Sequence, residues 1–160
     1  MSYLSNKELH EILQKAEIDL LNGEKIKFKK CKDWRMEFIP EKPGVYALFE
    51  DEKKLIYIGE TGNLHARMNE INRTVNHTFR KQLGHTRYGG TKSRKKFDED
   101  VEDKLNQFFE ENLYLSYIPV NYGRLEIETH IITKYQKLLL NSEKKRKVKM
   151  LLDEFEIDNL

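Results

Sequence analysis

One stretch of the chain decides the fold: PGVYALFEDEKKLIYIG, residues 43–59. Val45, Ala47 and Phe49 occupy every second position, and Leu55 and Tyr57 do so again after a short charged connection. A period of two is typical of strands, and many of these residue types favour strands. We therefore predict a β-hairpin with strands at 44–50 and 54–59.

The flanking sequence predicts helices around this hairpin and one further strand. In four segments apolar residues recur every three or four positions, which is the period of an amphipathic helix. These predicted helices cover residues 5–22, 63–74, 98–112 and 124–140. The run YLSYIPV, residues 114–120, predicts a third strand, whereas residues 25–40 alternate too weakly to assign. The predicted fold class is α/β (α+β), with a small, three-stranded, mainly antiparallel sheet flanked by helices.

The length of 160 residues suits a single domain, residues 1–160. Its core is predicted at about 43–141. The helix at 5–22 and a C-terminal helix at 142–156 are additions to this core, and residues 76–97 form a basic insert.

Composition excludes several classes of protein. The single cysteine, Cys31, excludes an internal disulfide framework and a zinc site made only of cysteines. No run approaches the roughly 20 apolar residues of a membrane span. Acidic residues among the apolar positions of the N-terminal segment argue against a secretory signal. We therefore expect a soluble, cytoplasmic protein without membrane association.

The net charge of +2 conceals a strongly basic segment. Residues 65–96 hold nine Lys and Arg residues against one acid, Glu70, so this segment carries +8 and the rest of the chain −6. A block this polarised suggests a polyanionic partner, and a solvated basic loop is the alternative. Residues 84–97 have three glycines and no apolar period, which predicts a flexible loop.

Two tyrosines and three later polar residues mark the candidate site. Tyr46 lies in the first strand, and Tyr57 follows eleven residues later on the paired strand. Arg67 comes ten residues after Tyr57, early in the next helix, and Glu128 and Asn141 come much later. Taken singly, such residues are ordinary strand aromatics and helix-surface charges. The order of all five is what suggests a chemical site.

These motifs resemble those of the GIY-YIG nucleases. The first motif is GVY at 44–46 and the second is YIG at 57–59, with Arg67 at a fitting distance. A late helix then supplies a glutamate, two apolar residues three and four positions further on, and an asparagine. These are Glu128, Ile131, Ile132 and Asn141. Glu126 is a competing glutamate, but the positions three and four further on from it are the polar residues Thr129 and His130. The resemblance spans about 43–141.

The resemblance implies that Tyr46 accepts the proton of the attacking water and that Arg67 binds phosphate oxygens. Arginine suits that task because its planar fork bonds two oxygens at once. A phenol with a pKa near 10 is a poor acceptor at neutral pH, so Tyr46 needs a nearby cation. Glu128 would hold one divalent ion, Mg²⁺ or Mn²⁺, since Mg²⁺ binds through few protein ligands. Tyr57 would help to hold the water or phosphate, and Asn141 would support the site by hydrogen bonds.

Two positions depart from the family pattern. Many members have a His or Tyr four residues after the arginine, where this chain has Ile71. Other members have a lysine soon after the second motif, where this chain has Glu60. His77, at the start of the basic insert, is the candidate substitute at the site, and His65 and His85 are the alternatives.

By the same resemblance, the chain is a metal-dependent endonuclease that hydrolyses phosphodiester bonds in DNA. A compact enzyme with an insert is most similar to the restriction-type members of the family. Cutting both strands would then call for a homodimer or a transient pairing on the duplex. A non-catalytic nucleic-acid-binding module on the same fold is the alternative function.

The basic insert and its flanks are the predicted DNA-contacting surface. Contacts from Lys and Arg to phosphates would give an affinity that falls steeply with salt. Tyr88 and Phe79 either stack on bases or pack, with packing favoured for Phe79. Arg87 and Arg94 are candidates for bidentate contacts to guanine. The candidate contact residues are Arg73, Arg80, Lys81, Arg87, Lys92, Arg94, Lys95 and Lys96.

Overall fold

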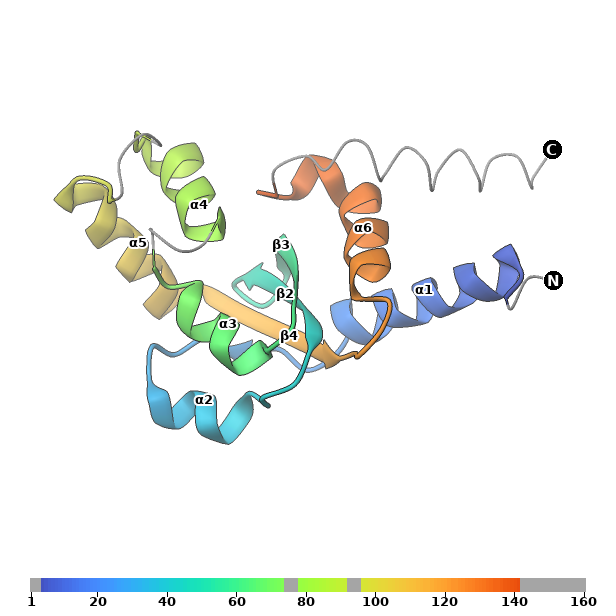
Figure 1. Cartoon of the computed structure of the whole chain (residues 1–160). Coiled ribbons are helices and arrows are strands. Elements are labelled where there is room, and N and C mark those ends of the chain that lie inside the picture. Colours follow the sequence, from blue (N-terminus) through green and yellow to red (C-terminus); the bar gives the residue numbers. More distant parts are fainter. Residues whose placement is uncertain (1–3, 74–77, 92–95, 142–160) are drawn as a thin grey trace.

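The structure is a computed structural model that describes residues 4–73, 78–91 and 96–141 (Figure 1). The predicted helix at 142–156 lies outside the described residues. The elements in chain order are α1 (Asn6–Leu21), β1 (Ile26–Lys27), α2 (Lys32–Phe38), β2 (Gly44–Glu50), β3 (Lys54–Thr61), α3 (Leu64–Glu70), α4 (Thr78–Tyr88), α5 (Glu99–Glu111), β4 (Leu113–Pro119), α6 (Arg124–Tyr135) and the 3₁₀ turn η1 (Gln136–Leu138).

The strands form one antiparallel sheet in the order β1-β4-β2-β3. The mixed class and the antiparallel hairpin are as predicted, and β2, β3 and β4 are the three predicted strands. The prediction of only three strands is wrong, because β1 adds a fourth: Ile26 pairs with Leu115 and Lys27 with Tyr114. A strand of two residues has no period, so the alternation that revealed the others is missing here.

Helices cover both faces of the sheet, and each face has its own apolar core. Along β2, Val45, Ala47 and Phe49 pack with α1 and α6, whereas Tyr46 and Leu48 pack with α2 to α5. Figure 1 shows α1 and α6 on one side of the strands and α4 and α5 on the other. Because β2 lies between β3 and β4 and is covered on both faces, all its residues but the last are buried.

The basic insert is more ordered than predicted, because residues up to Tyr88 form helix α4 rather than a flexible loop. Phe79 and Leu83 lie one turn apart and are fully buried, so α4 packs through an apolar face and Phe79 packs, as favoured above. A Cβ on Gly84 or on Gly90 would collide with the ring of Phe97. These glycines make room for an aromatic ring, so they do not indicate a flexible loop here.

The other helices agree with the prediction but their ends differ. Helix α3 ends at Glu70, short of the predicted 74, and α6 ends at Tyr135, where the 3₁₀ turn takes over. Helix α2 lies in the segment that the sequence left unassigned, and its Trp34 is buried. In the part of the chain that the structure describes, no helix has both the length and the apolar character of a membrane span.

Candidate active site

A β-bulge in the hairpin puts the two tyrosines on the same face of the sheet. Tyr46 pairs with Gly59 and Leu48 pairs with Tyr57, after which the register shifts by one residue. Regular pairing continued from the turn would instead place Tyr57 opposite Ala47, on the face covered by α1 and α6. Since a slip of one residue exchanges the two faces of a strand, the bulge decides where this phenol lies.

The glycine of the YIG motif makes room for the first tyrosine. A Cβ on Gly59 would overlap Cζ and the hydroxyl oxygen of Tyr46. Interiors are close-packed, so any side chain at position 59 would have to push the Tyr46 ring aside. The first motif has a similar constraint, since a Cβ on Gly44 would lie 2.5 Å from the carbonyl oxygen of Ile118. Both glycines therefore permit close approaches that a side chain would prevent.

The two tyrosine rings stack on one another in the interior. Their centroids lie 6.4 Å apart, with 26° between the ring planes. Tyr46 is 1% exposed and Tyr57 is 8% exposed. Burial, the largest effect on each, raises the pKa of Tyr46 well above its usual 10 and that of Tyr57 to about 12. Both phenols therefore hold their protons at neutral pH unless a positive charge favours the phenolate.

Helix α3 carries Arg67, whose guanidinium acts on both phenols. The side chain of Asn63 accepts a hydrogen bond from the Ala66 N–H (3.0 Å) and so caps the start of this helix. Arg67 Nη1 lies 3.2 Å from a carboxylate oxygen of Glu70, and the side chain is 30% exposed. Its Nε is buried and has no hydrogen-bond partner within the described ranges. The positive charge of Arg67 lowers the pKa of both phenols.

Helix α6 brings in the carboxylate of Glu128 from far along the chain. Its neighbours Ile127, Ile131 and Ile132 bury α6 against the sheet, and Glu128 itself is only 5% exposed. Its negative charge raises the pKa of both phenols. The competing glutamate, Glu126, is exposed.

These electrostatic effects require Tyr46, Tyr57, Arg67 and Glu128 to share one region, which we call the tyrosine cluster. The cluster joins the two strands of the hairpin to one helix from each side of the sheet. A guanidinium and a carboxylate both act on a pair of buried phenols there.

Asn141 fastens the end of the chain's last described segment to the hairpin. Its amide makes two hydrogen bonds to Ile58 of β3: Oδ1 accepts from the backbone N–H (3.0 Å), and Nδ2 donates to the carbonyl oxygen (2.6 Å). The N–H of Leu140 donates to the carbonyl of Ile56 (2.8 Å). Asn141 thus satisfies the backbone groups of Ile58 on the open edge of β3, beside Tyr57.

An ion pair next to the cluster joins the hairpin to α6. Arg124 Nε donates to a carboxylate oxygen of Glu60 at 3.1 Å, and the charge of Glu60 raises the pKa of Tyr46. Sequence reasoning missed Arg124. Its position one helical turn before Glu128 places both on the same side of α6, which is the signal that could have found it.

Comparison with protein families decides the relationship. A family model described as the GIY-YIG catalytic domain matches residues 25–154. The chain belongs to the GIY-YIG family. Membership supports a nuclease-type function broadly, with DNA as the substrate class, and GIY-YIG nucleases typically use divalent metal ions. No curated protein and no solved structure matches the chain.

Ile71, which departs from the GIY-YIG pattern, and the histidines proposed as its substitute have different environments in the structure. Ile71 is fully buried in the core. His77 lies outside the described residues. The Nδ1 of His65 is 3.2 Å from each of two carbonyl oxygens, those of Arg35 and Ile39, and the Nδ1 of His85 is 2.8 Å from the carbonyl oxygen of Gly90. Both alternative histidines are therefore engaged with the backbone.

One of the basic residues predicted to contact DNA belongs to the interior. Arg80 is 3% exposed. Its Nη2 donates to Glu102 at 2.7 Å and to Asn106 at 2.9 Å, and its Nη1 donates to Asn72 at 3.3 Å. Its guanidinium carbon also lies 5.2 Å from the centre of the Phe109 ring. Arg80 therefore joins α4 to α5 and is not available at the surface.

The remaining predicted contact residues divide into three groups. Arg87 pairs with Glu50 of β2, and that hydrogen bond is the first cause of its raised pKa. Arg73 and Lys96 are exposed and Lys81 is half-buried. Lys92, Arg94 and Lys95 lie outside the described residues.

The acidic side chains of the cluster fit only a metal ion that needs few protein ligands. Within the described ranges, no group of three or more His, Cys, Asp and Glu residues could hold a metal ion. Glu128 offers one buried carboxylate beside the phenols. Mg²⁺ suits such a place because it keeps several waters and is usually bound by one or two carboxylates together with substrate phosphates.

Proposed function

We propose that the chain is a metal-dependent endonuclease that hydrolyses phosphodiester bonds in DNA at the tyrosine cluster. The observation that carries the proposal is the burial of two stacked phenols under the opposing charges of Arg67 and Glu128. Buried groups with strongly shifted pKa values and specific charged neighbours are frequent at active sites. In a GIY-YIG domain, that arrangement is best explained as the centre of the reaction.

In this proposal Tyr46 accepts the proton of the attacking water. Burial holds its pKa well above 10, so the phenolate needs positive charge close by. Arg67 supplies part of that charge, and its effect on the Tyr46 pKa has the required sign. Tyr57 stacks against Tyr46 and keeps its own proton with a pKa of about 12, and in this proposal it would donate a hydrogen bond to water or phosphate.

Arg67 would bind the non-bridging oxygens of the scissile phosphate. Its buried Nε has no hydrogen-bond partner within the described ranges, so a donor is left for an anion. Leaving a buried donor unmatched costs about 1–3 kcal/mol, which binding of a phosphate would recover. Glu70 holds the other end of the guanidinium and fixes its direction.

Glu128 would hold a single divalent ion, Mg²⁺ or Mn²⁺. The chemistry that such an ion supplies when bound is stabilisation of the negative charge on the phosphate and on the leaving oxygen. Glu128 reaches this place because α6 is anchored by its buried isoleucines and by the contacts of Asn141 to β3. His77 stays a proposed participant at the edge of the site.

We propose one domain, residues 1–160, acting in the cytoplasm as a restriction-type enzyme. Arg73, Lys81, Arg87 and Lys96, together with Lys92, Arg94 and Lys95, would contact phosphates of the duplex. Severing both strands would use a homodimer or a transient pair of chains on the DNA. Arg80 is left out of this surface because its guanidinium is buried.

A plasmid-nicking assay tests the proposal. We expect supercoiled DNA to be nicked with Mg²⁺ and left intact with EDTA. Y46F should bind DNA like the parent and cut at least 10²-fold more slowly, since general-base catalysis contributes about 10²–10⁴. Y122F is the control, because Tyr122 is 92% exposed and lies outside the cluster.

The same assay includes the result that would refute the assignment. Cutting by Y46F at the parental rate would remove the proton-acceptor role. Salt-dependent binding without cutting by the parent would favour the non-catalytic binding module instead.

A further inference from the structure

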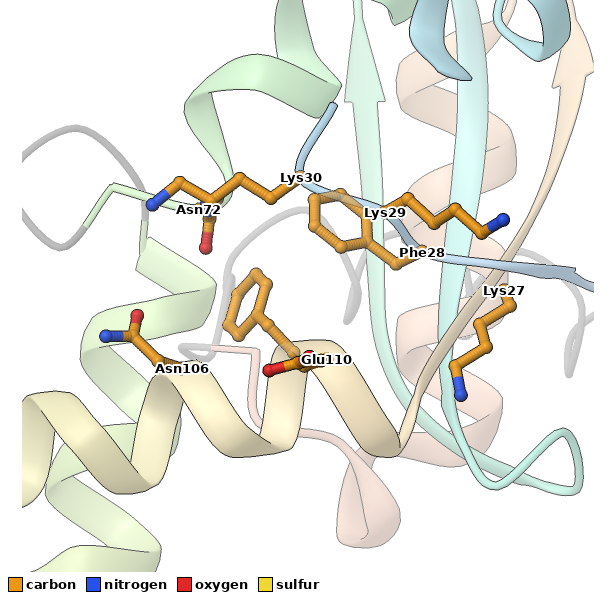
Figure 2. Close-up of a pocket in the computed structure, with 8 residues that line it drawn as sticks. Lys27, Phe28, Lys29, Lys30, Asn72, Asn106 and Glu110 are labelled. Atoms are coloured by element: carbon orange, nitrogen blue, oxygen red, sulfur yellow. The ribbon is translucent and has the colours of Figure 1, made fainter. Parts of the chain in front are cut away.

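A basic pocket lies on the same face of the sheet as the tyrosine cluster, at the opposite end of a row of aromatic rings. Figure 2 shows it between the segment after β1 and helix α5. Its volume of about 580 Å³ lies in the range of about 300–1,000 Å³ that is usual for ligand pockets. The proposed reaction uses none of the residues that line it.

The floor of the pocket is aromatic and rigid. Phe28 and Phe109 meet edge to face with centroids 5.4 Å apart, and both are buried. The guanidinium of Arg80 lies 5.2 Å from the centre of the Phe109 ring, where Glu102 and Asn106 also hold it. A planar group entering the pocket would meet the parts of these two rings that line it.

The walls are rich in hydrogen-bond donors. Lys27, Lys29 and Lys30 line the pocket, and in Figure 2 the amine of Lys30 lies on one side of the rings and those of Lys27 and Lys29 on the other. The amides of Asn72 and Asn106 both accept from Arg80 through Oδ1, so each leaves its Nδ2 group as a donor. Lysine and amide nitrogens suit a ligand with anionic oxygens and further acceptors.

The lysines belong to a basic run that the charge count of residues 65–96 did not include. The sequence KIKFKKCK, residues 25–32, holds five lysines in eight residues. Phe28 is the one aromatic residue in the run, and it points into the core while the lysines beside it are exposed. A strip of lysines around an aromatic floor is typical of surfaces that bind single-stranded nucleic acid.

A row of rings connects this pocket to the tyrosine cluster. The successive contacts are Phe28 with Phe109 (5.4 Å), Phe109 with Phe79 (5.7 Å), Phe79 with Tyr57 (5.3 Å) and Tyr57 with Tyr46 (6.4 Å). Phe28 therefore lies within about 23 Å of Tyr46, a span of about seven base steps at roughly 3.4 Å each. One strand of DNA is long enough to occupy both places.

We propose that this pocket binds one unpaired nucleobase of the DNA strand, with the three lysines on its neighbouring phosphates. The inference rests on the proposed function in one respect, that the ligand is DNA. It adds a substrate class: DNA with an unpaired nucleotide a few steps from the cut. The planar base would lie against the phenylalanine rings, and its carbonyl oxygens would accept hydrogen bonds from the asparagine amides. The phosphates would provide the anionic oxygens for the lysines.

Binding measured in EDTA separates this proposal from the chemistry of cutting. Fluorescence anisotropy would compare a paired duplex, the same duplex with one bulged nucleotide, and the same bulge carrying an abasic unit. We expect the bulged base to be bound about 5- to 150-fold more tightly than the abasic unit, since stacking is worth about 1–3 kcal/mol per base. Equal affinities for the base and the abasic unit would overturn the proposal.

Matched variants locate the effect. E110W should fill the pocket from an exposed position of α5 and abolish the preference for the base, whereas E111W, outside the lining, should keep it. K29E should weaken binding of all three DNAs, and K7E on α1 should not. A preference that survives in E110W would place the base elsewhere and refute the assignment.

A nicking assay on plasmid DNA, run alongside, keeps the two proposals apart. Base-dependent binding without any nicking would overturn the proposed nuclease reaction alone. Nicking without base-dependent binding would overturn the pocket assignment alone.

Discussion

The tyrosine cluster and the α4–α5 pair each contain an arginine, half-buried in the cluster (Arg67) and buried between the helices (Arg80), but they use it differently. In the cluster, Arg67 Nε is buried without a hydrogen-bond partner among the described residues, and only Glu70 holds the guanidinium by an ion pair. Between α4 and α5, Arg80 is bonded to one carboxylate and two amides. Arg67 has one N–H donor without a partner among the described residues, whereas Arg80 donates to side chains that belong to the interior.

This difference separates a group that binds a ligand from one that holds the structure. A buried donor without a partner costs free energy that a bound phosphate can recover, whereas a matched ion pair has nothing to gain from a ligand. The number of positive charges in the sequence does not distinguish the two cases. The hydrogen-bond partners do, and each of the following experiments tests one side of the comparison.

The largest effect is expected on stability, from R80M. Removing Arg80 leaves the carboxylate of Glu102 partly buried without its cation, and breaking a buried pair in this way typically costs about 3–5 kcal/mol. Denaturant unfolding followed by circular dichroism measures the loss. R87M on the same helix is the control: its pair with Glu50 is more exposed, and such pairs are worth about 0–1 kcal/mol. Equal losses in the two variants would refute the structural role of Arg80.

An intermediate effect is expected on cutting, from G59A. The new Cβ would overlap the Tyr46 phenol and displace its hydroxyl, and a shift of about 1 Å in a reacting group can cost about 10²-fold in rate. Nicking rates under saturating DNA measure the change, and DNA binding should stay near that of the parent. G62A is the control, because nothing lies within 4 Å of a Cβ at that exposed position. A parental rate in G59A would mean that the position of Tyr46 does not limit the reaction.

The hairpin and the tyrosine cluster were the most predictable parts of the molecule from sequence. Strand-favouring residues on either side of a short charged connection revealed β2 and β3, and in the structure the register of the two strands puts Tyr46 opposite Gly59. The GVY and YIG motifs indicated Tyr46 and Tyr57 together with Gly44 and Gly59. The sequence also favoured Glu128 over Glu126, and the structure shows the first buried and the second exposed.

Features that depend on a distant partner were not predictable in this way. The two residues of β1 form a strand only because Leu115 and Tyr114 are beside them. Gly84 is typical of a loop in sequence, but in the structure it lies in a helix where a side chain would collide with the ring of Phe97. The sequence predicts Arg80 as a DNA contact, but its hydrogen bonds to Glu102 and Asn106 of α5 hold it in the interior. In each case the local sequence is compatible with two structures, and a contact between distant segments selects one.

The smallest effect is a shift in the pKa of Tyr57, and it tests the charges of the tyrosine cluster without any DNA. The phenolate of Tyr57 is disfavoured by the negative charge of Glu128 and favoured by the positive charge of Arg67. E128Q should therefore lower its pKa below about 12, and R67Q should raise it further. Carbon-13 NMR of labelled tyrosines, with Y57F to assign the signal, measures both shifts. E126Q is the control on the same helix, since that carboxylate is exposed. If E126Q shifted the pKa of Tyr57 as much as E128Q does, Glu128 would not be distinguished from Glu126 as the carboxylate of the cluster. The proposed metal site, which depends on Glu128, would then be refuted.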